Sequence, residues 1–179
     1  MLFLVSFALA KEPVISQQVD WHEYNQVTRK LCKTVRTKEE YGATLLAQLI
    51  FITNAEIALV SGQMHLSEIR RQVHVSRVAS GFSHEVEALK ADAIITLSLE
   101  ALLQELERIE AMKLKMEREM QLNSRSATPR GFPRRVLRDW CNDSFGNTRD
   151  YMQHALYVLV SQDTTISTIP LASLFTPLY

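Results

Sequence analysis

The stretch that decides the fold is SHEVEALKADAIITLSLEALLQELERIEAMKLKMEREMQLN, residues 83–123. It contains neither glycine nor proline, the residues that most often interrupt a helix. Apolar side chains recur along it mostly in steps of three and four, which is the spacing of one helix face. They are Val86, Leu89, Ala93, Leu97, Leu99, Leu102, Leu106, Ile109, Met112, Met116 and Met120. We therefore predict one continuous helix of about 40 residues, about 60 Å long.

The second half of this stretch combines a narrow apolar stripe with mixed charge. Six glutamates alternate with Arg108, Lys113, Lys115 and Arg118 between residues 100 and 120. This pattern is typical of a bundle or coiled-coil helix whose charged face is solvated. The stripe shifts its phase near residues 97–99, so a strict heptad is not maintained. An antiparallel bundle within one chain is favoured over a long free coiled coil.

Two helices are predicted in the first third of the chain. Residues 20–35 place Tyr24, Val27, Leu31 and Val35 on one stripe. Thr37 and Glu40 form a capping-box pattern that opens a helix over residues 38–60.

After that second helix the pattern is less regular. Ser61-Gly62 resembles a helix C-cap, because glycine accepts the left-handed conformation. Residues 64–78 predict a third helix, with a strand at 72–79 as the alternative because of its valines. Residues 80–83 read as a break or a kink, and Ser83 is the expected N-cap of the long helix.

The chain divides into four parts on this interpretation. Residues 1–10 are an apolar segment, 11–123 form the bundle core, and 124–133, with two prolines and a glycine, form a linker. Residues 134–179 are expected to form a small C-terminal helical appendage: two short helices, separated by Gly146-Asn147, and an extended apolar tail. The fold class is all-α.

The first ten residues, MLFLVSFALA, have two interpretations. They are too short to span a bilayer, and Ala8-Leu9-Ala10 fits the pattern cleaved in export signals. No basic residue precedes Lys11, however, which an export signal normally has, so a retained apolar segment stays open. Export would make the protein periplasmic or extracellular; retention would make it cytoplasmic.

The compartment decides the state of the two cysteines, Cys32 and Cys141. In an oxidising compartment we expect them to form a disulfide, and in a reducing one to be two small apolar residues. Neither lies in a Cys-x-x-Cys motif.

No motif of catalysis or cofactor binding is present. The glutamates lack the Glu-x-x-His pattern of di-iron bundles, His84-Glu85 lacks a second histidine at 88, and no glycine-rich phosphate loop occurs. We expect no catalytic residue, no metal and no cofactor, although a site built from dispersed residues stays open.

Two sets of residues are candidates for contact with partners. A protein interface is the hypothesis for Met112, Met116, Met120, Leu171, Leu174 and Phe175, with the simple bundle core as the alternative for the methionines. Phosphate contact is the hypothesis for Arg125, Arg130, Arg134, Arg135 and Arg138. The twenty basic and twenty acidic residues balance, which argues against a general polyanion binder.

These observations favour a non-enzymatic helical assembly or adaptor subunit that contacts other proteins, as a homo- or hetero-oligomer. Small exported helical bundles of this build occur in envelope, secretion and conjugation machines, an analogy of architecture alone. The alternative is an intracellular or viral scaffold that contacts nucleic acid through residues 125–138. We expect no transmembrane span, and contact with a membrane surface stays open.

Overall fold

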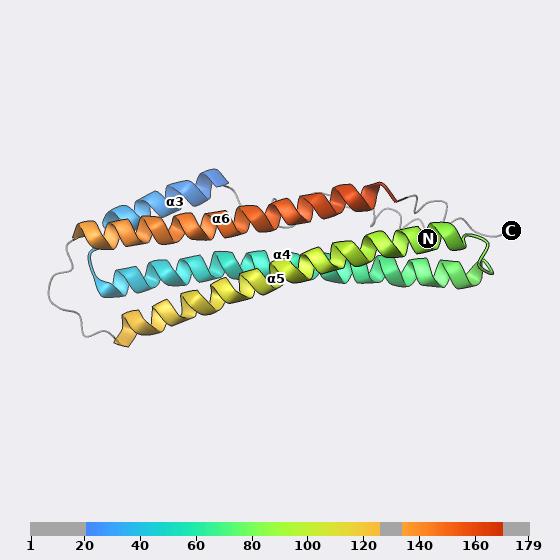
Figure 1. Ribbon diagram of the computed structural model, residues 1–179. Coiled ribbons are helices and arrows are strands. Elements are labelled where there is room, and N and C mark those ends of the chain that lie inside the picture. The colour runs from blue at the N-terminus through green and yellow to red at the C-terminus, as the bar shows by residue number, and fades with distance from the viewer. Residues whose placement is uncertain (1–20, 126–133, 170–179) are drawn as a thin grey trace.

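The protein is an all-α helical bundle (Figure 1). The structure is a computed structural model that describes residues 21–125 and 134–169. Within these ranges it contains helices α3 (Trp21–Thr34), α4 (Lys38–Ala79), α5 (Glu85–Arg125) and α6 (Arg134–Ser167), and no strand. The all-α prediction is confirmed, and α5, with 41 residues, is the long helix expected from residues 83–123.

Helix α4 begins at the predicted capping box. The Thr37 hydroxyl accepts a hydrogen bond from the Glu40 amide at 3.2 Å, and the Glu40 carboxylate accepts one from the Arg36 amide at 2.7 Å. The Glu40 amide in the first turn of α4 is thereby satisfied, and the returning bond from the Glu40 carboxylate reaches the amide of Arg36, which precedes the N-cap.

Helix α4 then continues for 42 residues, through the break expected at Ser61-Gly62. Both the C-cap at residue 62 and the alternative strand at 72–79 are wrong. Gly62 has a packing role instead: a Cβ atom there would lie 3.1 Å from Cδ2 of Leu159 and 3.7 Å from Cδ1 of Leu102. Side chains of α5 and α6 therefore pack against the α4 backbone where a side chain is absent.

The predicted break at residues 80–83 is a tight turn between α4 and α5. Gly81 and Phe82 both have positive φ angles, 62° and 64°, which allow the chain to reverse. Helix α5 begins at Glu85, two residues after Ser83, the expected N-cap. Arg77 and Glu85 form an ion pair at 2.6 Å across the turn.

The C-terminal region differs most from expectation. In place of two short helices in an appendage, a single helix, α6, runs through Gly146-Asn147. It lies along the bundle and buries Cys141, Phe145, Met152 and Leu159 in the same core as α4 and α5 (Figure 1). It is therefore a full member of the bundle.

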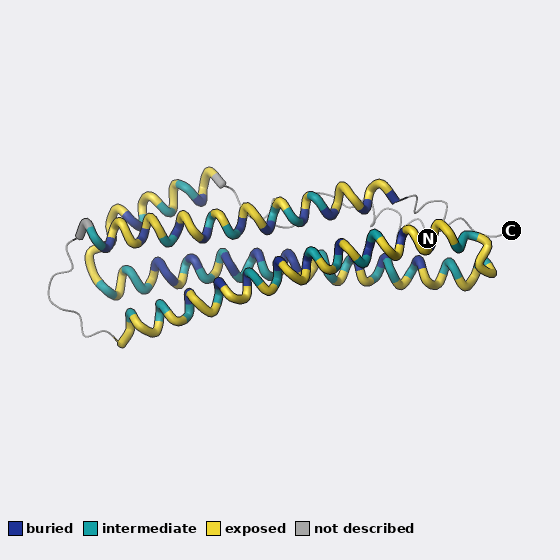
Figure 2. The backbone as a smooth tube through the Cα atoms, viewed as in Figure 1, coloured by how far each residue is buried: buried dark blue, intermediate teal, exposed yellow. Residues whose placement is uncertain are grey.

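The buried residues form one continuous core between the helices (Figure 2). The antiparallel α4–α5 hairpin extends beyond the end of α6, so its turn is formed by two helices alone among the described residues (Figure 1).

Candidate functional site

The sulfur atoms of Cys32 and Cys141 are joined in a disulfide, 109 residues apart in sequence. It links α3 to α6, and both cysteines are fully buried. Next to it, the Tyr24 hydroxyl donates a hydrogen bond to the carbonyl of Phe145 at 2.9 Å. Burial raises the pKa of the Tyr24 phenol above its ordinary value, so the hydroxyl keeps its proton and its role as donor. This end of the bundle is a structural joint.

A charged cluster lies between α5 and α6 at Glu105. Arg108 donates two hydrogen bonds to the Glu105 carboxylate, at 2.6 and 3.2 Å, and Nδ1 of His154 lies 2.8 Å from its Oε2. The Arg108 guanidinium also lies over the Tyr151 ring, 4.5 Å from its centroid. Glu105 is only 3% exposed, so the expectation that it belongs to a solvated face is wrong.

The sequence contained a signal for this buried carboxylate. Glu105 lies three residues after Leu102 and four before Ile109, both buried, and so occupies a core position of α5. Arg108, on α5, holds the Glu105 carboxylate in place, and His154 contacts it from α6. This contact fixes the register of α6 against α5. Its side-chain contacts in the described residues are with Arg108 and His154, and no second carboxylate is among them.

A smaller polar contact fixes α4 against α6. Ser144 and Thr148 donate hydrogen bonds to Oε1 of the fully buried Gln48, at 2.5 and 3.1 Å. In residues 21–125 and 134–169, no group of three or more His, Cys, Asp or Glu side chains is placed to hold a metal ion.

The methionines expected at a partner surface lie in the core. Met112 is 5% and Met116 2% exposed, and Met120 packs against the same cluster. Within the single chain, Met112 and Met116 therefore belong to the bundle core, and Met120 is half-buried beside it. The other expected interface residues, Leu171, Leu174 and Phe175, lie outside the described residues.

The arginine set is described only in part. Arg125 and Arg138 are exposed, near the ends of α5 and α6 that the segment 126–133 connects. Arg130 lies outside the described residues, as do the side chains of Arg134 and Arg135. Phosphate contact by this set stays a prediction.

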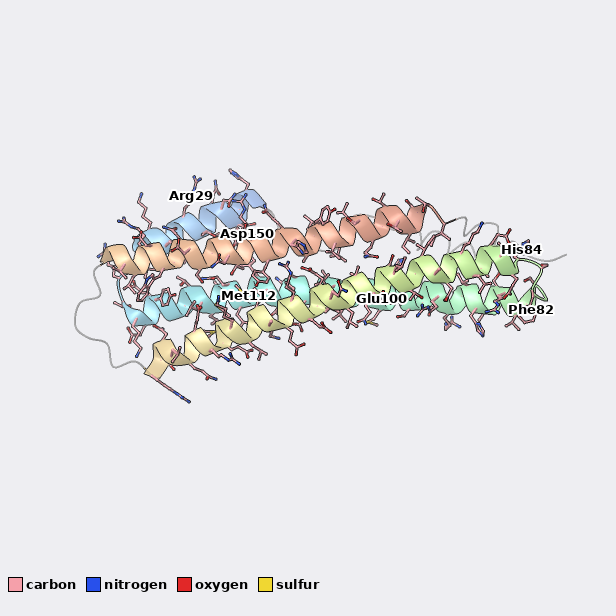
Figure 3. All side chains as sticks on the ribbon, viewed as in Figure 1. Arg29, Phe82, His84, Glu100, Met112 and Asp150 are labelled. Atoms are coloured by element: carbon pink, nitrogen blue, oxygen red, sulfur yellow. A yellow bond between two sulfur atoms is a disulfide. The ribbon has the colours of Figure 1, made fainter. Side chains whose placement is uncertain are left out.

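Large exposed apolar side chains occur on all the long helices: Leu97, Leu103, Leu114 and Leu122 on α5, Trp140, Tyr157 and Val160 on α6, and a longer series on α4. On α4 large apolar side chains face away from the core, each 39–69% exposed; they are Leu46, Ile50, Ile57, Val60, Met64, Val75 and Val78. Phe82, 55% exposed, lies at the turn at the far end of the hairpin (Figure 3). We call the α4 set from Leu46 to Met64 the α4 apolar face.

Sequence reasoning missed this face because residues 45–60 are apolar on nearly every side. By length and composition, α4 is the one helix among the described residues that is apolar enough to cross a membrane. Core helices of soluble proteins pass the same test. The prediction of no transmembrane span was based on residues 45–60 alone. These residues form part of the longer helix α4, and the prediction stays untested.

No family model, no curated protein and no solved structure matches this chain.

Proposed function

We propose that the protein is a non-enzymatic helical assembly subunit whose work is to contact other protein chains in a larger complex. The observation that carries the proposal is the α4 apolar face. The 19 residues from Leu46 to Met64 contain one acidic or basic side chain, Glu56, which pairs with Lys113 of α5. About half of the surface of Leu46, Ile50 and Ile57 is exposed. Continuous exposed apolar surface of this kind marks sites of interaction.

Export of the protein is part of this proposal. A buried disulfide between Cys32 and Cys141 is typical of oxidising compartments, and it supports the interpretation of residues 1–10 as an export signal. The α4 apolar face also supports a role in an assembly. On a freely diffusing exported protein this face would stay exposed and would bind other proteins non-specifically.

The test is photo-cross-linking in the native host. A photo-reactive amino acid at Ile57, in the centre of the face, is expected to give covalent adducts with defined protein partners. The matched control is the same residue at Glu107, which is exposed on the charged side of α5. Equal labelling at the two positions, or no adduct at Ile57, would contradict an assembly role for this face.

A further inference from the structure

The exposed side of α4 repeats with a heptad spacing. Starting from the first turn, positions separated alternately by four and three residues stay on one side of the helix, opposite the core. These positions are Glu39, Ala43, Leu46, Ile50, Thr53, Ile57, Val60, Met64, Ser67 and Arg71. The average spacing of 3.5 residues is that of a coiled-coil seam, in which two helices stay in contact along their length.

The opposite side of α4 is already occupied. Gln48, Ile52, Ala55 and Leu59 are at most 1% exposed and face α5 and α6. The seam is therefore an additional face and does not compete with the packing of the bundle.

The seam is apolar in its centre and charged at its ends. Apart from Glu56, no acidic, lysine or arginine side chain occurs between Glu40 and Glu68. Glu56 points to the side, where it lies 3.6 Å from Lys113 of α5. Beyond the centre, Glu39 lies at one end of the seam and Arg71 at the other, both exposed.

The order of residues along the seam is self-complementary. If a second α4 is turned end to end about position 55, Leu46 meets Met64 of the second copy, Ile50 meets its Val60, and Thr53 meets its Ile57. The small residues Ala43 and Ser67 then lie opposite each other. Large apolar side chains meet one another through the centre of such a contact, as an isologous two-fold interface requires.

The charges agree with the same arrangement. In the end-to-end orientation Glu39 of each copy meets Arg71 of the other at the rims. Arg71 also forms an ion pair with Glu68 of its own helix at 2.7 Å, so each rim contact brings Glu39 to an existing Arg71–Glu68 pair. In the parallel orientation Glu39 would meet Glu39 and Arg71 would meet Arg71. Binding to a lipid surface would not depend on opposite charges at the two ends of the seam.

We propose that the α4 apolar face binds a second copy of this chain through an antiparallel α4–α4 coiled coil centred near residue 55. This inference rests on the proposed assembly function and names one partner for it. The dimer is two-fold symmetric and leaves the α5 face, the disulfide joint and the Glu105 cluster outside the contact.

The first test is the mass of the full-length, disulfide-bonded protein in solution, measured by sedimentation velocity over a range of concentrations. The wild type is expected to dimerise. Ile57→Glu is expected to raise the dimer dissociation constant by about 100-fold or more, because it buries an unpaired carboxylate in each half of the contact.

The matched control for that variant is Leu97→Glu, which places the same charge on an exposed apolar residue of α5. It is expected to leave the dissociation constant unchanged. Circular dichroism of both variants shows whether the bundle is intact. A wild type that stays monomeric overturns the proposal, as does a monomer that binds phosphatidylcholine vesicles through Ile57.

The second test is of register. Glu39→Arg and Arg71→Glu each place like charges together and are expected to weaken the dimer by about three- to tenfold. The double variant Glu39→Arg/Arg71→Glu restores opposite pairs and is expected to recover wild-type affinity. Two weakened single variants without recovery in the double variant overturn the antiparallel register.

The outcomes also separate this proposal from the assembly function. A monomeric wild type that still forms Ile57 photo-adducts with other proteins excludes the second copy as partner and leaves the assembly function standing. Absence of any Ile57 adduct, together with a stable dimer in solution, would restrict the function to self-association.

Discussion

A Cβ atom at Gly62 would lie 3.1 Å from Cδ2 of Leu159, so α4 and α6 approach each other where α4 has no side chain. The first prediction follows from this contact. Gly62→Val is expected to lower the free energy of unfolding by about 1–3 kcal/mol, because the added methyl groups overpack Leu159 and Leu102. Urea unfolding followed by circular dichroism measures the change.

The control for that prediction is the second mid-helix glycine, Gly146 of α6. A Cβ atom there would meet nothing within 4 Å. Gly146→Ala is therefore expected to stabilise the protein by about 0.5–1 kcal/mol through helix propensity alone. A Gly62→Val variant as stable as the wild type or more stable would contradict close packing at Gly62.

These two glycines also show why sequence reasoning divided α4 and α6 into shorter helices. Each was interpreted as a helix end, since glycine ends helices more often than it continues them. What keeps the helices continuous is tertiary: Leu159 and Leu102 fill the space at Gly62, and Thr148, next to Gly146-Asn147, bonds the buried Gln48. Local propensity contains no information about either contact, whereas the uninterrupted apolar spacing of residues 83–123 predicted α5 correctly.

The candidate site divides in a similar way. A chain with two cysteines can form only one intramolecular disulfide. The Cys32–Cys141 bond of an oxidised chain could therefore be predicted from the sequence alone. The sequence hypothesis placed a partner surface at Met112 and Met116, and both side chains are buried in the bundle. A helix that is apolar nearly all round, such as residues 45–60, does not reveal which side faces the core until its neighbours are placed.

The disulfide gives the second prediction. Replacing Cys32 and Cys141 together by alanine is expected to lower the free energy of unfolding by about 2–5 kcal/mol, since the bond closes a loop of 109 residues in the unfolded chain. Urea unfolding with and without reductant measures it. Reductant should destabilise the wild type and leave the double variant unchanged.

The same bond provides a test of compartment. Intact mass of the protein from its native host is expected to rise by the mass of two hydrogen atoms on reduction, and to lack residues 1–10. Free thiols together with a retained leader would contradict export.

The Glu105 cluster gives the third prediction. Glu105→Gln removes the charge that Arg108 and His154 share, and the hydrogen bonds of Arg108 become weaker. We expect a loss of about 1–3 kcal/mol in the free energy of unfolding. Glu107→Gln, two residues on and exposed, is the control and should stay within about 0.5 kcal/mol of the wild type. Equal effects would show that the buried cluster does not stabilise the α5–α6 contact.

The fourth prediction concerns pH and Asp163 near the end of α6. Asp163 is exposed at the surface, but partial desolvation by the surrounding protein raises the pKa of its carboxyl from 3.8 to about 6. Between these two values the folded chain holds a proton that the unfolded chain has released, so this group makes the protein less stable as the pH rises from about 4 to 6. This loss of stability is then fully present at neutral pH and absent below about pH 4.

Asp163→Asn is therefore expected to raise the melting temperature at neutral pH and to lose that advantage on acidification. Thermal unfolding across this range measures both. Asp143→Asn, which changes a second exposed aspartate of the same helix, controls for loss of a surface charge. A constant difference between Asp163→Asn and the wild type at every pH would show that the carboxyl does not titrate with a raised pKa in the folded protein.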